Sequence, residues 1–331
     1  MNKKLFIIAE MSGNHNQSLE RALAIVDAAA EAGADAIKLQ TYTAETMTMR
    51  DVYTIKDEKS LWKGLDLYEL YEEAHTPWEW HEAIFKRAKE RGIVCFSTPF
   101  DETAVDFLEK LGNPIYKIAS FEVNHLPLLK YIAKTGKPVI MSTGASTLSE
   151  IREAVKTLRK NGCKDLTLLK CTSTYPATPQ DTNLLTIPHM AKSFGCEAGL
   201  SDHTLGIGVA VASVALGVRV IEKHFCLSRA EGGVDSAFSL EPAEFKSLVE
   251  EAQRAKSALG KINYEILPAE ENSRIFKRSI YASQEIKKGE KFTKDNIRII
   301  RPSFGLAPKY FEKQLRKTAL KNYKKGEPII K

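Results

Sequence analysis

Residues 5–41 read LFIIAEMSGNHNQSLERALAIVDAAAEAGADAIKLQT, a short apolar run followed by an alanine-rich amphipathic stretch and a second apolar run. Short apolar runs that alternate with helical stretches are typical of βαβ units in a parallel sheet. Gly33 follows the amphipathic stretch at a position where glycine commonly ends a helix. We therefore predict a strand, a helix and a second, parallel strand over these residues.

The same alternation continues to about residue 260. Six further apolar runs occupy residues 93–98, 115–120, 138–144, 166–172, 196–202 and 218–225. Eight βα units within about 250 residues predict a (β/α)8 TIM barrel, with an open doubly wound sheet as the alternative. No GxGxxG or P-loop motif opens any of the helices, which removes the usual reason to prefer the open sheet.

The character of the sequence changes after the barrel. Residues 261–274 are polar and contain Pro268, and short strand-like runs with two KKGE turns follow them. We predict a catalytic barrel over residues 1–262, a linker over 263–272 and a small β-rich domain over 273–331. A domain of that size is only marginally stable alone.

The connection between the second and third apolar runs, residues 42–75, is too long for an ordinary βα loop. It carries Trp62 and several tyrosines, and we expect it to fold over the barrel rim as a lid. For its outer half, a peripheral helical decoration is an equally good interpretation.

The composition is that of a globular protein, with 43% hydrophobic and 27% charged residues. The net charge of +6 is concentrated in C-terminal basic runs, but glycine and glutamate interrupt them, which favours a solvated surface over a nucleic-acid site. The first apolar run is brief and meets Glu10, so it resembles neither a signal peptide nor a membrane span. Five cysteines without a CxxC pair fit a reducing compartment. We expect a cytoplasmic protein with no nucleic-acid or membrane partner.

Polar residues stand at the carboxyl end of every predicted strand. In a barrel these ends meet at one rim, where active sites form. The residues are Glu10, Lys38, Gln40, Ser97, Thr98, Lys117, Ser120, Ser142, Thr143, Thr172, Ser173, Ser201, Asp202, His203, Glu222 and His224.

Two histidines, His203 and His224, lie at neighbouring strand ends, each beside a carboxylate. Taken singly, each is more often a hydrogen-bonded core histidine. Together they can share one divalent cation and leave coordination positions open, as a catalytic metal requires. The sequence has no HxH or HExxH motif, which weakens a metal-hydrolase interpretation.

The lysines and hydroxyls at the rim describe a second reactant. A set of cations and hydroxyl donors suits a small phosphorylated anion. A single rim lysine could instead form a Schiff base, as in aldolases, but two lysines beside a histidine pair favour the anion. The residues of this set are Lys38, Thr98, Lys117, Ser120, Ser142, Ser173 and Ser201.

Eight motifs resemble, in order, those of the sialic acid synthase family. They are IIAEMSGNHNQ, GADAIKLQTY, CFSTPFD, YKIASFE, MSTG, LKCTSTYP, GLSDHT and VIEKHF, and RSIYASQEIKKGE and RPSFG resemble the family's antifreeze-like (SAF) domain. The resemblance implies a transferase that joins phosphoenolpyruvate to an N-acetylated hexose on a barrel with a divalent metal, usually manganese or magnesium.

The resemblance also implies roles for individual residues. Glu10 would donate or accept a proton near the sugar. Glu222 would orient a water molecule or contact the metal ligands without binding the metal itself. Gln40, Tyr175, Asp235 and Arg301 match sugar-contacting positions, with Arg301 reaching across a domain-swapped homodimer from the partner chain. The alternative for Arg301 is packing in a surface turn. For His15, a loop-ordering hydrogen bond and a rim role are equally good interpretations.

Ser173, in CTSTYP, stands where sialic acid synthases proper usually carry asparagine. With the sequences of residues 61–80, 117–122 and 301–311, it resembles the branch of the family that uses 2,4-diacetamido-2,4,6-trideoxy-L-altrose. N-acetylneuraminate or legionaminate synthesis is the alternative within the family. A carbohydrate-binding module is the alternative outside it, and only the antifreeze-like segment suggests it.

Overall fold

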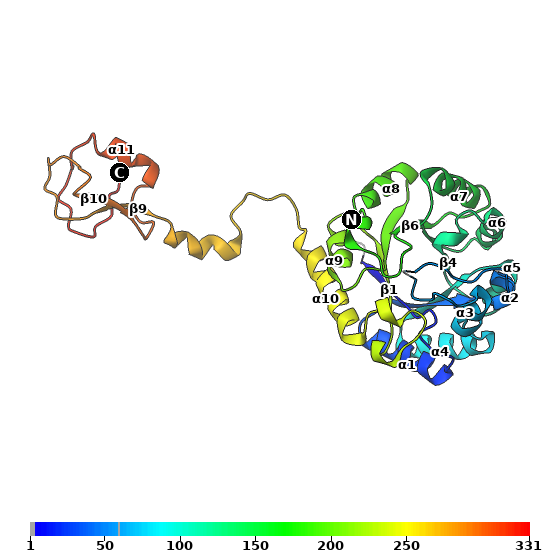
Figure 1. Ribbon diagram of the computed structural model, residues 1–331. Helices are drawn as coiled ribbons and strands as arrows, with labels where there is room; N and C mark the ends of the chain where they lie inside the picture. The colour runs from blue at the N-terminus through cyan, green and yellow to red at the C-terminus, as the bar shows by residue number, and fades with distance from the viewer. Residues whose placement is uncertain (1–3, 59) are drawn as a thin grey trace. The chain divides into compact units, whose positions relative to one another are not determined.

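A computed structural model describes residues 4–58 and 60–331, so the first residues of the basic start, Met1–Lys3, lie outside it. The chain forms two compact units, Met1–Gly260 and Lys261–Lys331 (Figure 1). We describe each unit by itself. The predicted boundaries at residues 262 and 273 stay a prediction.

The first unit is a closed barrel in which β1 pairs with β2, each further strand pairs with the next, and β8 returns to β1. The pairings within the barrel are parallel, as in Glu10 opposite Lys38 on one side and His224 on the other. This confirms the predicted TIM barrel and excludes the open sheet. The strands are β1 Phe6–Glu10, β2 Ala36–Thr41, β3 Val94–Pro99, β4 Tyr116–Ile118, β5 Val139–Ser142, β6 Leu166–Cys171, β7 Glu197–Asp202 and β8 Val220–His224.

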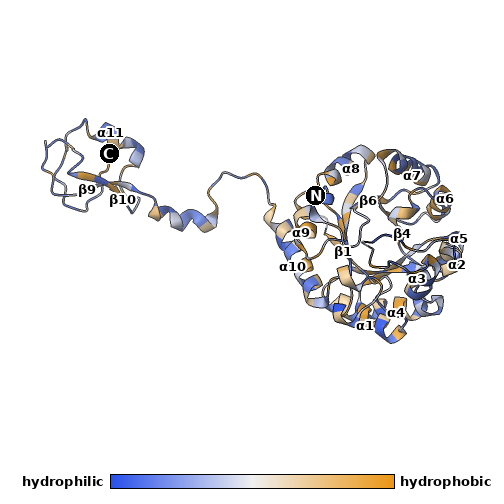
Figure 2. Ribbon diagram, viewed as in Figure 1, coloured by the Kyte–Doolittle hydropathy of each residue, from blue (hydrophilic) through white to orange (hydrophobic). Residues whose placement is uncertain are grey.

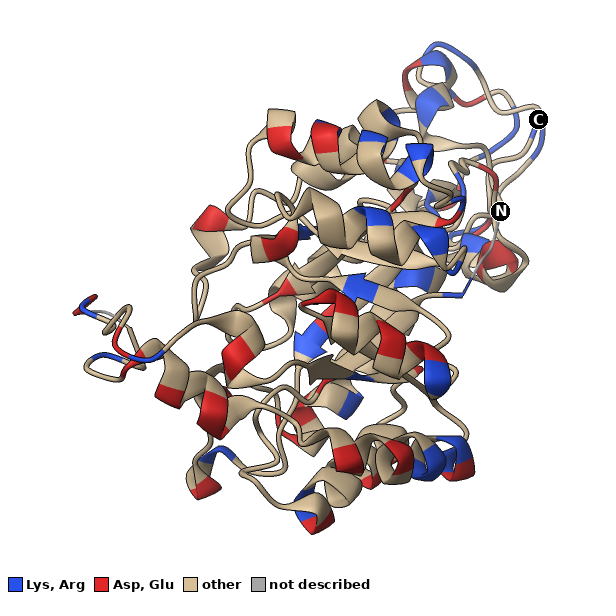
Figure 3. Cartoon of the chain, turned by 90° about the vertical axis from the view of Figure 1, so that its right-hand side faces the viewer, with Lys and Arg blue, Asp and Glu red and all other residues tan. Residues whose placement is uncertain are grey.

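Helices surround the barrel, and most of them carry both apolar and polar residues (Figure 2). Charged residues of both signs are spread over these helices (Figure 3). The helices of this unit are α1 Leu19–Glu31, α2 Ala44–Met47, α3 Leu67–Ala74, α4 His81–Arg91, α5 Glu102–Lys110, α6 Leu126–Lys134, α7 Leu148–Lys160, α8 Thr186–Phe194, α9 Gly208–Val214 and α10 Pro242–Ala258, with 3-10 turns η1 Trp78–Trp80, η2 Ser120–Glu122, η3 Pro179–Asp181, η4 Arg229–Glu231 and η5 Ser236–Phe238.

Local sequence sets several helix ends. Thr147 accepts a hydrogen bond from Glu150 N–H at the start of α7, and the Glu150 side chain returns to Thr147 N–H, a capping box. At the start of α5 the Asp101 side chain accepts hydrogen bonds from the N–H groups of Thr103 and Ala104. The helix α4 ends at Gly92, whose φ of 75° is readily available only to glycine.

The inside of the barrel is divided into an apolar layer and a polar layer. Ile8, Phe96, Ile140, Leu169 and Val220 form a buried apolar cluster inside the barrel, and each lies at least two residues before the carboxyl end of its strand. Because residues two apart on a strand face the same way, the next inward positions are at the carboxyl ends. Those positions are polar, and they begin the candidate site.

The second unit contains a two-stranded antiparallel sheet of β9 Ser279–Ala282 and β10 Ile297–Ile300. Its core is formed by Ile280, Ile286, Phe292, Ile297, Ala319, Tyr323 and Ile329. The turns η6 Pro268–Phe276 and η7 Pro308–Tyr310 and the helix α11 Phe311–Gln314 complete it. The predicted small β-rich domain is therefore confirmed. Along residues 4–58 and 60–331, no helix is long and apolar enough to cross a membrane.

Candidate active site

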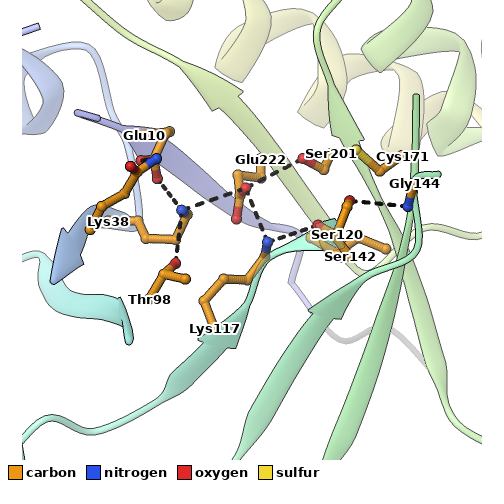
Figure 4. A network of polar contacts seen from close by, with 12 residues as sticks. Glu10, Lys38, Thr98, Lys117, Ser120, Ser142, Gly144, Cys171, Ser201 and Glu222 are labelled. Carbon is orange, nitrogen blue, oxygen red and sulfur yellow. Dashed lines mark hydrogen bonds and ion pairs between the residues drawn. The ribbon is translucent and has the colours of Figure 1, made fainter. Parts of the chain in front are cut away.

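Two lysines and two glutamates occupy the polar layer inside the barrel (Figure 4). Lys38 forms an ion pair with Glu10, and its Nζ lies 3.8 Å from Glu222 Oε1. Lys117 Nζ lies 3.5 Å from the same oxygen of Glu222. Both lysines are buried, since each is at most 3% exposed. Each lysine has a carboxylate partner, which reduces the cost of burying its charge.

The pKa values of these four groups reflect burial and their mutual contacts. Burial raises the pKa of Glu10, and the opposing effect of Lys38 does not cancel this. For Glu222, burial is outweighed by Lys117 and Lys38, which lower its pKa. Burial lowers the pKa of Lys117, whereas the pKa of Lys38 is raised because Glu10 and Glu222 outweigh burial. Glu10 is thus the more easily protonated of the two carboxyl groups.

Hydroxyl groups complete the layer. Lys38 Nζ donates to Thr98 Oγ1 at 3.2 Å, and Lys117 Nζ donates to Ser142 Oγ at 2.7 Å. Ser201 Oγ donates to Glu222 Oε1 at 3.3 Å. These contacts bring three of the predicted hydroxyl groups into one network with the lysines.

The remaining two predicted hydroxyls, those of Ser120 and Ser173, surround Gly144. Gly144 N–H donates to Ser120 Oγ at 3.0 Å. A Cβ atom at position 144 would lie only 2.1 Å from Ser173 Oγ and 2.9 Å from Ser120 Oγ. Glycine is therefore required for this close approach, and the structure brings all seven predicted anion-binding residues to the same rim.

The two rim histidines face each other, with ring centroids 5.2 Å apart. His203 Nδ1 lies 2.9 Å from the carbonyl oxygen of Thr172 and must donate to it, so Nε2 is the nitrogen that would bind a cation, in the neutral ring. Burial acts to lower the pKa of His203, but Cys171 and the Thr172 carbonyl raise it, so a cation would have to displace a proton from Nε2. His224 Nδ1 is buried, and it has no hydrogen-bond partner among residues 4–58 and 60–331. Burial and His203 hold the pKa of His224 well below its ordinary value, so this imidazole is neutral.

These features fit an open cation site with two imidazole ligands. Within the described part of the chain, no group of three or more His, Cys, Asp or Glu side chains is arranged to hold a metal. Water and substrate oxygens would have to supply the other ligands, as an octahedral cation allows. Asp202 is not available as one, because its carboxylate pairs with Lys223 at 2.8 Å on the outward side of the strands.

Cys171 lies beside this histidine pair. Its Sγ is 4.0 Å from His203 Nδ1 and 3.7 Å from Ser173 Oγ. Although burial acts to raise the pKa of this thiol, His203 and the neighbouring hydroxyls lower it to about 6. The thiol is therefore more acidic than an ordinary cysteine.

A cavity of about 300 Å³ opens beside His224. Gln40, Tyr175 and Asp235, the predicted sugar-contacting residues of the barrel, all line it. Asp235 Oδ2 lies 3.8 Å from His224 Nδ1. The volume lies at the lower limit for small-molecule pockets, roughly 300 Å³.

Two other predicted residues lie elsewhere. Arg301 is exposed in the second unit, where it lines a separate hollow with Arg278 and Ser303. His15 is buried, accepts a hydrogen bond from Gln17 N–H at 3.2 Å and contacts Thr76. These contacts favour the loop-ordering interpretation of His15.

Sequence reasoning missed two cavity residues. Ser12 donates to Asp235 Oδ2 and accepts from Gln40 at 3.0 Å, so it joins two predicted sugar contacts. Glu122 has a buried oxygen that finds no hydrogen-bond partner in the described part of the chain, and burial raises the pKa of this carboxyl group to about 7. Ser12 belongs to the motif IIAEMSGNHNQ and Glu122 to YKIASFE. Neither residue stands at the end of a predicted strand, so the strand-end pattern points to their polar neighbours and not to them.

Comparisons with known proteins agree with this geometry. The model of the NeuB family matches residues 25–264, and that of the SAF domain matches residues 277–331. The chain is 47% identical to a pseudaminic acid synthase of Campylobacter jejuni, over 99% of this chain and 96% of that protein. It is 39% identical to an N,N'-diacetyllegionaminic acid synthase of the same species, over 99% of each. A crystal structure of an N-acetylneuraminic acid synthetase from Leptospira borgpetersenii superimposes with a TM-score of 0.72 at 33% identity, covering 82% of this chain and 90% of that one.

Proposed function

The chain belongs to the NeuB family, and on this premise we propose that it catalyses the pseudaminic acid synthase reaction. In that reaction phosphoenolpyruvate, 2,4-diacetamido-2,4,6-trideoxy-L-altrose and water give pseudaminic acid and phosphate. The full-length similarity to a pseudaminic acid synthase, which exceeds that to a legionaminic acid synthase, carries the choice of product. The predicted resemblance to the sialic acid synthase family is confirmed.

The lysine and hydroxyl layer is the proposed phosphoenolpyruvate site. Lys38 and Lys117 would pair with the phosphate and carboxylate groups, while Thr98, Ser120, Ser142, Ser173 and Ser201 would donate hydrogen bonds to them. Burial strengthens these interactions because little water competes inside the barrel. Burial lowers the pKa of Lys117, and a bound anion would favour its charged form.

The sugar would occupy the neighbouring cavity with its aldehyde toward the histidines. A divalent cation, manganese or magnesium, held by His203 and His224 would polarise the aldehyde oxygen. Gln40, Tyr175 and Asp235 would hold the sugar's hydroxyl and amide groups, since all three line the cavity.

The proposed chemistry has two bond-forming steps. The enol electron pair of phosphoenolpyruvate forms a bond from C3 to the sugar's C1, and the aldehyde oxygen takes a proton from Glu10. This leaves C2 cationic, and water adds there and returns a proton to Glu10. The new C2 hydroxyl then gives its remaining proton to the phosphate group as the C2–O bond breaks, so that phosphate leaves and C2 becomes a ketone. The raised pKa of Glu10 supports its role as the acid. Glu222, held by Lys117 and Ser201, would orient the water.

We also propose that the protein is a homodimer in which Arg301 of one chain contacts the sugar bound by the other. The exposure of this arginine and its place in a hollow of the second unit leave it accessible to a ligand. A guanidinium offers several fixed donors for hydroxyl and acetamido oxygens. The five free thiols remain compatible with the predicted cytoplasmic location.

The experiment that tests the proposed function is phosphate release from phosphoenolpyruvate with a panel of sugars. The panel contains the diacetamido-trideoxy-altrose, the legionaminic acid precursor and N-acetylmannosamine. We expect the largest kcat/KM for the first. A larger value for either of the others would transfer the assignment to that branch of the family.

A further inference from the structure

The segment between β2 and α4 forms a folded flap at the carboxyl end of the barrel. It contains the helices α2 and α3, and the chain between them folds back on itself, with Ile55 N–H donating to Leu65 O at 3.0 Å and Gly64 N–H donating to Ile55 O at 2.8 Å. Thr54 and Asp66 pair in an antiparallel bridge. Backbone hydrogen bonds within the segment therefore hold its described part in a defined fold. A lid over the barrel rim, as predicted for residues 42–75, needs such a fold.

Apolar side chains of the flap line the sugar cavity. Met47, Ile55, Leu67 and Leu70 all contribute to its surface, and we call these four side chains the apolar wall. None of the four can donate or accept a conventional hydrogen bond. The polar lining comes mainly from the strand ends and loops of the barrel, at Ser12, Gln40, Glu122, Tyr175, His224 and Asp235, and the flap adds Tyr71. The cavity therefore has a mainly polar part formed by the barrel and a mainly apolar part formed by the flap.

Trp62 joins the flap to the catalytic rim. Its indole Nε1 donates to the carbonyl oxygen of Val234 at 3.0 Å, and Val234 immediately precedes Asp235. Its ring lies 5.7 Å, between centroids, from that of Tyr175. One half-buried side chain thus contacts the loops that carry two of the proposed sugar ligands.

We propose that Trp62 is a specificity-determining residue, which fixes the apolar wall against the part of the sugar farthest from its aldehyde. The proposal rests on the proposed function, because it takes the aldehyde to lie beside His224. With C1 held there, the sugar's C6 methyl and an acetamido methyl extend toward the flap. Methyl groups lose no hydrogen bond to water when the wall covers them.

A C6 hydroxyl would be treated differently. N-acetylmannosamine has a hydroxyl at C6 and another in place of the C4 acetamido group. Where these hydroxyls face the wall they would lose hydrogen bonds to water without a replacement. Apolar pockets discriminate against an added hydroxyl by about 100-fold at most. The wall can therefore account for a preference for the 6-deoxy sugar of about 10- to 100-fold.

The test compares three tryptophan variants with two sugars. Trp62→Ala removes the indole hydrogen bond and the ring contact, whereas Trp62→Phe keeps an aromatic ring beside Tyr175. The control is Trp78→Phe, because Trp78 Nε1 also donates to a backbone carbonyl, that of Tyr42 at 3.2 Å, but does not line the cavity. Steady-state kinetics are measured with the diacetamido-trideoxy-altrose and with N-acetylmannosamine, and the unfolding temperature is measured for each variant.

We expect Trp62→Ala to raise KM for the diacetamido sugar and to reduce the ratio of the two kcat/KM values by about 10-fold or more. Trp62→Phe should fall between wild type and Trp62→Ala. KM for phosphoenolpyruvate and the unfolding temperature should stay close to wild type, and Trp78→Phe should leave the ratio unchanged.

One result would overturn the inference while leaving the proposed function intact, namely an unchanged ratio of the two kcat/KM values in Trp62→Ala. If both values fell equally, Trp62 would serve binding or folding in general, and if neither fell, Trp62 would have no role in sugar binding. If wild-type protein releases no phosphate with the diacetamido sugar, the proposed function fails, and the inference fails with it.

Discussion

Gly144→Ala is the substitution whose effect on the proposed phosphoenolpyruvate site follows most directly from the structure. The added methyl would lie 2.1 Å from Ser173 Oγ and 2.9 Å from Ser120 Oγ, so at least the first hydroxyl must move. A hydrogen bond to a charged group contributes about 1.5 to 3 kcal/mol. Loss of one such bond to the bound anion corresponds to a rise in KM of roughly 10- to 140-fold, because 1.4 kcal/mol is a factor of ten.

The assay is phosphate release at varied phosphoenolpyruvate and saturating sugar. The control is Gly208→Ala, because a Cβ atom at position 208, the first residue of α9, meets nothing within 4 Å. The double variant Gly144→Ala with Ser173→Ala loses the atom at 2.1 Å, so we expect it to regain thermal stability but not affinity. An unchanged KM in a folded Gly144→Ala protein would refute the assignment of Ser173 to the anion site.

Three further predictions concern the metal, a buried carboxyl group and the dimer. His203→Ala should abolish turnover and stoichiometric Mn²⁺ binding without unfolding the barrel, and full activity in excess chelator would contradict this. Glu122→Gln should stabilise the protein more at pH 8 than at pH 5. Burial raises the Glu122 pKa from 4.5 to about 7, so the folded wild-type protein loses stability as the pH rises through that range, whereas the glutamine variant does not. Denaturant unfolding at both pH values measures the two free energies, and an equal effect of the substitution at both would contradict the prediction. Mixing inactive His203→Ala and Arg301→Ala proteins under subunit exchange should restore activity, and no recovery with exchange confirmed would place Arg301 outside the partner's site.

The barrel and its polar rim could be predicted because both depend on short-range pattern. The period of two within each strand places Lys38 with Gln40, and Glu222 with His224, on the same side. Eight such strands leave few ways to bury their apolar faces other than closure. The positions of the candidate residues therefore follow from the strand assignment alone.

The pairing of side chains across the rim could not be predicted in the same way. Closure of β8 against β1 brings Glu222 near Lys38, and these residues are far apart in sequence. The contacts of Ser12 with Asp235 and of Trp62 with Val234 depend on how two long loops pack. No local period specifies such packing, so these residues become apparent only in the folded chain.

The central claim is tested most directly by one measurement, the ratio of kcat/KM for phosphate release with the diacetamido-trideoxy-altrose to that with N-acetylmannosamine, in the presence of Mn²⁺. We predict a ratio of about 10 or more, with pseudaminic acid formed in the same amount as phosphate. A ratio of one or less, or phosphate release without a nine-carbon product, would contradict the account.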